Sequence, residues 1–257
     1  MIKSMHNLDV IQEEIGLCFT IDRSLPGRGY LALLQKAVQY ADRAGFSFAW
    51  VMEAADVKQN PTIIQSTLSV QTKRIALRGQ CLSPDRRDAI RSVEDWSIVD
   101  NLSNGRIGVM VAADFDEAMN RHVAELRGLW KGESVKRMNG VGKEVELKVF
   151  PRPLQKELPI WVCMTAAHDE TAFKKAGELG VHILVTPDLH SAEKTVQYRK
   201  AAKEQGRVAW LVDPGYGNLS ADGVNEIAFK VDLSWGEARV INCLENLAAS
   251  LKSMNPA

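Results

Sequence analysis

The sequence predicts an α/β fold built on a parallel sheet. Short apolar runs rich in β-forming residues alternate with longer segments of helical periodicity along nearly the whole chain. A length of 257 residues with 46% hydrophobic content is sufficient for one large core. We therefore expect a single domain over residues 1–257, of which 1–14 form a polar leader.

The predicted elements follow one another in a regular order. The apolar run IGLCFTI (15–21) predicts the first strand, and residues 30–45 predict a helix that Gly45 ends. Asn60-Pro61 is typical of the start of the next helix. The other predicted strands are 48–53, 75–82, 106–113, 160–164, 181–187, 208–212 and 224–232. The other predicted helices are 60–74, 88–105, 116–132, 169–180, 191–206 and 236–254.

Two irregularities interrupt this order. A short alternating, strand-like segment and a Pro-rich turn lie between 142 and 159. Only DPGYGNLSADG separates the seventh strand from the eighth, so the seventh helix is predicted to be missing. The rhythm suits a (β/α)₈ barrel, yet a doubly wound open sheet has the same rhythm. LPGRGY follows the first strand, so the dinucleotide-binding fingerprint GxGxxG is absent there.

Charge and hydropathy argue against several classes of protein. Lys plus Arg and Asp plus Glu each number 32, so no net field attracts nucleic acid or an acidic membrane. The longest apolar runs are far shorter than the roughly 20 residues needed to cross a bilayer. The first 16 residues lack the apolar core of a signal peptide, which predicts a cytoplasmic protein.

Metal binding and disulfide bonding are not expected. The four cysteines show no CxxC spacing, and the five histidines show no ligand spacing. We expect reduced, mostly buried thiols and no metal site. The cysteines are Cys18, Cys81, Cys163 and Cys243.

Several stretches resemble one family along nearly the whole chain. Residues 89–113, AIRSVEDWSIVDNLSNGRIGVMVAA, are the most specific, with Asp95 where the family has Glu and Asn104 where it has Gly. LWKGE (129–133) and GKEVELKVFPRPLQKELPIWV (142–162) add a Pro-Arg-Pro turn. Shorter matches lie at 44–54, 176–180 and 223–232. On these residues the chain resembles the bacterial-luciferase-like flavin-dependent monooxygenases, in the branch associated with non-ribosomal peptide and polyketide gene clusters.

The resemblance implies a fold and a chemistry. It implies a (β/α)₈, TIM-barrel-like fold, here trimmed, with shortened loops on the carboxyl-terminal face and no seventh helix. It also implies reduced FMN as co-substrate, O₂ as oxidant and an organic substrate. The sequence does not identify that substrate. A separate flavin reductase would supply the reduced FMN. Members of the family commonly dimerise through early helices, which implies a homodimer.

The candidate site residues lie at predicted strand ends. The resemblance makes Glu53 a catalytic candidate, although it could equally pair with a neighbour at the barrel rim. Arg78 is a second candidate, because an Arg on a barrel-lining face of the third strand could counter flavin charge, although it might equally be a buried partner for Glu53. The remaining candidates would bind the cofactor, partly because small and hydroxyl side chains at a helix start suit a phosphate. They are Gln80, Ala112, Thr165, Ala166, His168 and Thr171.

Plainer interpretations compete with these assignments. Asp169 and Glu170 would repel a phosphate unless they point away, and they also make a good helix cap. Trp96, Trp130 and Met110 lie where core residues are normal. The role of residues 213–223 stays open.

The family loops after the second and fourth strands are shortened here, as is the connection after the seventh. An alternative function follows from this shortening, namely a non-catalytic flavin-binding protein or a partner subunit of an active homologue.

Overall fold

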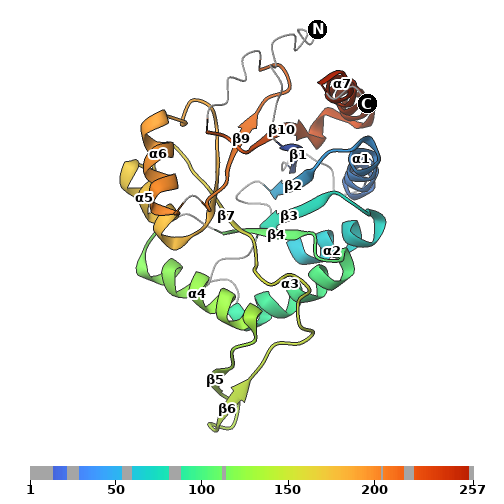
Figure 1. The fold of residues 1–257 in the computed structure, drawn as a ribbon. Coiled ribbons are helices and arrows are strands. Elements are labelled where there is room, and N and C mark those ends of the chain that lie inside the picture. The colour runs from blue at the N-terminus through green and yellow to red at the C-terminus, as the bar shows by residue number, and fades with distance from the viewer. Residues whose placement is uncertain are drawn as a thin grey trace.

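The computed structural model describes residues 14–21, 29–53, 60–80, 88–111, 114–203, 205–216 and 223–254. Eight parallel strands close into a barrel in the order β1-β10-β9-β8-β7-β4-β3-β2, and helices surround it (Figure 1). The expected trimmed (β/α)₈ barrel is therefore confirmed. No helix in the described part of the chain is long and apolar enough to cross a membrane.

The structure places the elements close to the predicted ranges. The barrel strands are β1 (Glu14–Ile21), β2 (Phe48–Glu53), β3 (Ala76–Gln80), β4 (Ile107–Val111), β7 (Ile160–Cys163), β8 (His182–Val185), β9 (Val208–Val212) and β10 (Glu226–Asp232). The helices are α1 (Tyr30–Ala44), α2 (Pro61–Gln71), α3 (Ala89–Ser103), α4 (Glu117–Lys131), α5 (Glu170–Leu179), α6 (Ala192–Ala201), the short 3₁₀ helix η1 (Leu233–Trp235) and α7 (Glu237–Met254).

Local chemistry explains where the helices begin and end. The Asn60 side chain accepts a hydrogen bond from the Thr62 N–H at 3.1 Å, with Pro61 in the first turn, as the sequence predicts. Gly45 ends α1 with φ 92°, a left-handed conformation that glycine adopts without steric cost. Between β9 and β10, the described residues 213–216 and 223–225 contain no helix, which agrees with the predicted loss of the seventh.

A two-stranded hairpin lies outside the barrel, and only one of its strands was predicted. The alternating segment contains β6 (Glu144–Leu147), but it pairs antiparallel with β5 (Val135–Met138), which was not predicted. The resulting hairpin projects away from the barrel (Figure 1). Because β5 is short and half of it is charged, it carries no apolar signal that would indicate a strand.

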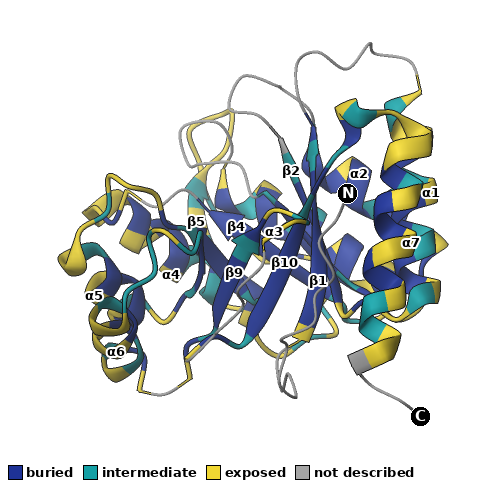
Figure 2. Ribbon diagram, turned by 90° about the horizontal axis from the view of Figure 1, so that it is seen from above, coloured by how far each residue is buried: buried dark blue, intermediate teal, exposed yellow. Residues whose placement is uncertain are grey.

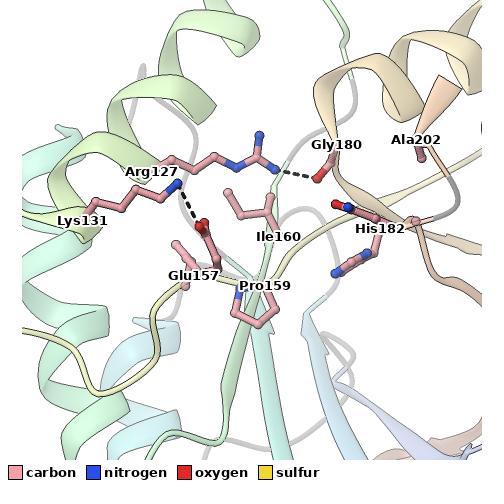
Figure 3. A pocket seen from close by; sticks show the side chains of 11 residues that line it. Arg127, Lys131, Glu157, Pro159, Ile160, Gly180, His182 and Ala202 are labelled. Carbon is pink, nitrogen blue, oxygen red and sulfur yellow. Dashed lines mark hydrogen bonds and ion pairs between the residues drawn. The ribbon is translucent and has the colours of Figure 1, made fainter.

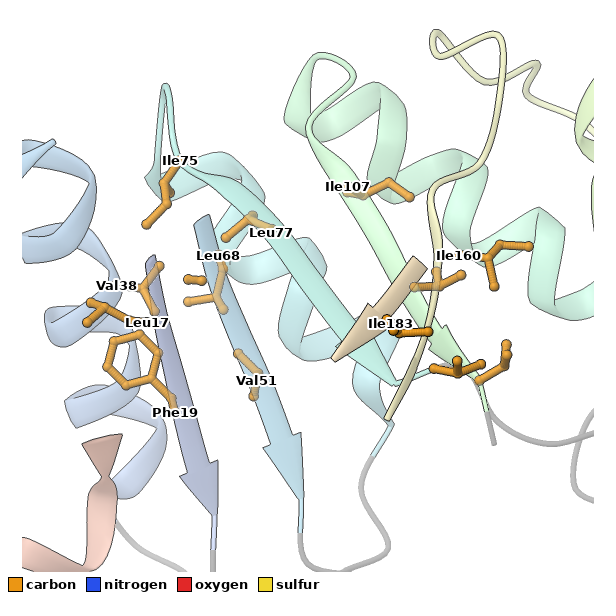
Figure 4. Packing of buried hydrophobic residues seen from close by; sticks show 14 of the residues in the cluster. Leu17, Phe19, Val38, Val51, Leu68, Ile75, Leu77, Ile107, Ile160 and Ile183 are labelled. Carbon is orange, nitrogen blue, oxygen red and sulfur yellow. The ribbon is translucent and has the colours of Figure 1, made fainter. Parts of the chain in front are cut away.

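Two apolar layers form the core. Outward-facing strand residues, among them Leu17, Val51 and Ile183, pack against the buried faces of the helices (Figure 4). The alternate residues, among them Trp50, Trp161 and Leu184, fill the barrel interior. Helices bury the face toward the sheet and expose the other (Figure 2). Trp96 and Trp130 are buried in the outer layer and Met110 in the inner one, as the core interpretation expected.

Residues 100–106, within the most specific family stretch 89–113, hold the amino-terminal end of β4 in place. The buried Asp100 carboxylate accepts hydrogen bonds from the backbone N–H groups of Leu154 (2.6 Å) and Gln155 (3.0 Å). The Arg106 guanidinium donates to the carbonyls of Ser69 (3.2 Å) and Thr72 (3.0 Å). The motif therefore ties α3 to the segment after the hairpin and to the end of α2, which is a structural role.

Candidate active site

Inward-facing side chains near the carboxyl ends of the strands define the candidate site. Strand residues alternate between the interior and the helices, so the inward positions follow from the interior cluster. Six of them are half-buried and together form what we call the barrel mouth: Thr20, Met52, Gln80, Cys163, Leu211 and Lys230. Below the mouth, the interior is closed by Trp50, Met110 and Leu184. The site thus combines an apolar floor with a polar rim.

Lys230 is the cation of the barrel mouth. It lies opposite Cys18 in the β1–β10 register, and within the described chain no carboxylate forms an ion pair with it. Burial raises the pKa of the Cys18 thiol to about 12, Cys163 acts in the same direction, and Lys230 opposes both. Cys18 therefore remains protonated at neutral pH and is no nucleophile. A half-buried, unpaired ammonium group suits an anionic ligand.

Lys230 was not among the candidate site residues, although its strand, 224–232, was predicted. The usable signal was the alternation along EIAFKVD, which puts Lys230 on the same face as Ala228, inside the barrel near the carboxyl end. A lysine at such a position is unusual, because barrel interiors are dominated by apolar side chains.

The structure brings only some of the predicted residues to this end of the barrel. Gln80 lies in the barrel mouth as the last residue of β3. Glu53 is the last residue of β2, opposite Ile21, and its side chain lies outside the described residues. Ala112 also lies outside them.

Arg78 lies deeper, in an environment that the sequence did not predict. Its guanidinium forms a two-pronged ion pair with the fully buried Glu226, with Nη2 2.9 Å from Oε1 and Nη1 bonded to Oε2. Glu226 begins β10, so Arg78 points toward the amino-terminal end of the barrel. The alternative that Arg78 pairs with Glu53 gains no support, because β3 places Arg78 opposite Trp50, three residues before Glu53, and the described partner of Arg78 is Glu226.

Aromatic rings complete the surroundings of Arg78. Its guanidinium carbon lies 4.2 Å from the ring centroid of Phe48 and 4.4 Å from that of Trp161. Arg207 shares the same carboxylate, with Nη2 2.8 Å from Glu226 Oε1. Cation–π contacts and ion pairing hold the Arg78 guanidinium inside the barrel, below the barrel mouth. The structure therefore gives no support for a direct contact between Arg78 and a ligand at the barrel mouth.

The predicted phosphate site lies at the start of α5, beyond β7. The Thr165 N–H donates to His168 Nδ1 at 2.8 Å, and Thr165 Oγ1 is 3.1 Å from the same nitrogen. Asp169 caps the helix by accepting from the Ala172 N–H at 3.0 Å. Glu170 is directed to α6, where its Oε2 accepts from Gln197 Nε2 at 3.1 Å. The capping interpretation therefore describes Asp169, whereas Glu170 points to a neighbouring helix.

Thr165, Ala166 and Thr171 are exposed around this helix start. The turn before α4 reaches the same place, because the Phe115 ring meets the His168 ring edge to face at 5.7 Å between centroids. Phe115 has φ 48°, which is unusual for a residue with a side chain, and its ring is buried. Such backbone strain is typical of functional sites. The contact between the Phe115 and His168 rings joins the segments that follow β4 and β7.

No group of three or more His, Cys, Asp or Glu side chains in the described ranges is arranged to hold a metal ion. Of the described cysteines, Cys18 and Cys243 are buried and Cys163 is half-buried, all as free thiols. Asp213 and Tyr216 are exposed in the turn after β9.

Comparison with known proteins identifies the class to which this barrel belongs. Residues 15–215 match the profile of the luciferase-like monooxygenase family, and the chain belongs to that family. No curated protein matches the sequence significantly.

Solved structures of similar fold share little sequence with this chain. The monooxygenase RslO1 from Streptomyces bottropensis is 15% identical, with a TM-score of 0.60 over 93% of this chain and 82% of its own. An F420-dependent secondary alcohol dehydrogenase in complex with an F420-acetone adduct is 13% identical, with a TM-score of 0.71 over 95% and 100%.

The oxygenating constituent of a Baeyer-Villiger monooxygenase from Pseudomonas putida, in complex with FMN, is 16% identical, with a TM-score of 0.58 over 77% of this chain and 66% of its own. At these identities the likeness establishes the barrel fold and leaves the chemistry to the site residues.

Proposed function

We propose that this chain is an FMN-dependent monooxygenase or related oxidoreductase that uses reduced FMN and O₂ on an organic substrate. The single observation that carries the proposal is Lys230, half-buried above the apolar floor of the barrel mouth and without an ion-pair partner among the described residues, in a chain of this family. A flavin has a flat apolar ring system with a polar edge that becomes anionic on reduction, and this combination fits such a ring. A natural-product pathway as the source of the substrate, and a cytoplasmic location, belong to the same proposal.

Different residues of this chain would bind the ring system and the phosphate of FMN. Lys230 would hold the anionic edge of the ring system, while Gln80 donates or accepts at the opposite part of the mouth. Trp50 and Met110 below would keep water from the buried face. Thr165, Ala166, His168 and Thr171 would face the phosphate end, with Asp169 retained as the helix cap. Reduced FMN, when bound, supplies the electrons for the activation of oxygen.

Replacement of Lys230 by methionine tests this assignment. The variant keeps the length of the side chain and removes the charge, so we expect the dissociation constant for FMN to rise about tenfold, the usual order for one charge-assisted contact. Fluorescence titration of FMN measures this change. Replacement of Lys174, which forms an exposed pair with Glu178, by methionine is the matched control and should leave the affinity unchanged. Equal affinities of Lys230→Met and wild type would remove Lys230 from the site.

A non-catalytic role is the competing proposal. The short connections after the second, fourth and seventh barrel strands favour it, since barrel chemistry depends on the loops of that face. Oxidation of organic test substrates, with FMN and a flavin reductase, distinguishes the two. Turnover by the isolated chain excludes the non-catalytic role. FMN binding without turnover across aldehydes, ketones and aromatic substrates supports it, as a flavin-storing protein or partner subunit.

We also propose a homodimer through α2 and α3. Ile63 and Val70 on α2, with Ile98 and Leu102 on α3, are exposed by between 44% and 65%, which is costly for adjacent apolar residues in a monomer. The double variant Ile98→Glu, Leu102→Glu should therefore be monomeric by light scattering, near the chain mass of 28.5 kDa.

The wild-type protein should have twice this mass at micromolar concentration. Val196→Glu, at a 63% exposed position on α6, is the matched control and should remain dimeric. A monomeric wild-type protein would contradict the dimer.

A further inference from the structure

Two adjoining clefts lie at the other end of the barrel, away from the barrel mouth. The larger has a volume of about 470 Å³ and the smaller about 280 Å³. Both are lined by Pro159 and His182, so His182 lies where they meet. Figure 3 shows the larger cleft with both residues in its lining. The larger one also has an apolar wall of Leu158, Ile160 and Ala202. Its size is that of a small-molecule site.

The charged side chains that line these clefts are almost all cationic. Among the described lining residues these cations are Arg78, Arg106, Arg127, Lys131 and Arg207, against one carboxylate, Glu157. Lys131 and Glu157 form an exposed ion pair at 2.8 Å and neutralise each other. Arg78 and Arg207 share the buried Glu226, and Arg207 also pairs with Glu14 at 2.9 Å.

Among the described residues, Arg106 in the smaller cleft is bound only by carbonyl and hydroxyl oxygens. In the larger cleft, Arg127 is the described cation that forms no ion pair with a described carboxylate. Its Nη1 and Nη2 donate to the carbonyls of Leu179 and Gly180, both at 2.6 Å, and these bonds hold the guanidinium at the rim of the cleft (Figure 3). No carboxylate of the described residues lies within ion-pair distance of it. Burial lowers the pKa of Arg127, with Glu157 acting in the opposite direction. A partly desolvated guanidinium with neutral partners favours the approach of an anion.

His182 supplies a neutral donor beside this charge. Burial, together with the charges of Arg78, Arg207 and Arg127, lowers the pKa of His182 to about 4. The ring is therefore uncharged at neutral pH. Its Nδ1 accepts from the Arg207 backbone N–H at 3.2 Å, so the proton of the neutral ring resides on Nε2. That N–H has no protein partner in the described structure and can donate to a ligand.

From these contacts we infer that the cleft between α4, β7 and β8 is a second ligand site, which binds a small molecule bearing a phosphate or carboxylate group. Arg127 supplies the positive charge, His182 supplies a neutral hydrogen-bond donor, and Leu158, Ile160 and Ala202 contact the apolar part of the ligand. The site is separate from the barrel mouth, because Arg78 and Glu226 fill the interior between them. It does not depend on flavin use.

Titration of the full chain with inorganic phosphate and, separately, acetate tests this site, with potassium chloride at equal ionic strength as reference. The side-chain resonances of His182 in the ¹⁵N-histidine NMR spectrum should shift as anion is added. For at least one anion the shift should saturate, with a dissociation constant below about 10 mM. Saturation by phosphate alone indicates a phosphoryl ligand, and by acetate alone a carboxylate.

Variants separate this site from a general salt effect. Arg127→Met removes the positive charge of the site, and Lys131→Met leaves the Glu157 carboxylate without its partner beside it, so each should weaken anion binding about tenfold. Arg121→Met, at an exposed position on α4, should not weaken it. Lys131→Met keeps the test valid if Arg127→Met unfolds, since the Lys131 ion pair is exposed. No saturable shift of His182 with either anion, or unchanged affinity in Lys131→Met and Arg127→Met, overturns the inference.

Discussion

Replacement of Arg78 by methionine is expected to lower the free energy of unfolding by about 3–5 kcal/mol, the cost of leaving a buried charge without its partner. Glu226 is fully buried, and Arg78 supplies two of its hydrogen bonds. Arg207 remains to pair with it, which puts the expected value in the lower part of this range. Denaturant unfolding measures the change.

Two further variants make this result specific. The double variant Arg78→Met, Glu226→Gln removes the buried charge that has lost one of its two cationic partners, so it should recover part of the stability lost in Arg78→Met. Arg121→Met, which breaks an exposed pair with Glu117, should change stability by no more than about 0.5 kcal/mol. A double variant no more stable than the single one would show that aromatic packing around Arg78, and not ion pairing, dominates.

Replacement of Asp100 by alanine is expected to cost about 2–4 kcal/mol, because it removes the buried acceptor of three partly buried hydrogen bonds. The carboxylate accepts from the N–H groups of Leu154 and Gln155 and from Gln155 Nε2 at 2.7 Å. Asp100→Asn keeps one carbonyl oxygen and should lose less than half as much. Thermal unfolding compares the two. Equal losses would mean that the carboxylate charge, and not its hydrogen bonds, stabilises this corner.

Much of the fold could be predicted from local sequence patterns. Periodicity revealed all eight barrel strands, and local signals such as Asn60-Pro61 and Gly45 marked helix ends, because both depend on near neighbours. The choice of a barrel over an open sheet depended on the family resemblance, since strand order depends on contacts between distant residues. The hairpin strand β5 escaped prediction because its charged residues bury almost nothing.

The site was less predictable, because its partners are far apart in sequence. Arg78 and Glu226 are separated by 148 residues, and nothing near either of them indicates the other. The expectation of a Glu53 partner depended on strand proximity, whereas the register aligns Arg78 with Trp50. Lys230 was readable from strand alternation alone. The cationic cleft was not, because α4, β7 and β8 each contribute only one or two of its side chains.

The central claim is that the barrel mouth holds reduced FMN, and anaerobic titration with reduced FMN tests it most directly. We predict saturable binding in the micromolar range, tighter than that of a reduced F420 deazaflavin, and weakened in Lys230→Met. Absence of binding at concentrations well above micromolar, or a clear preference for the deazaflavin, would contradict the account.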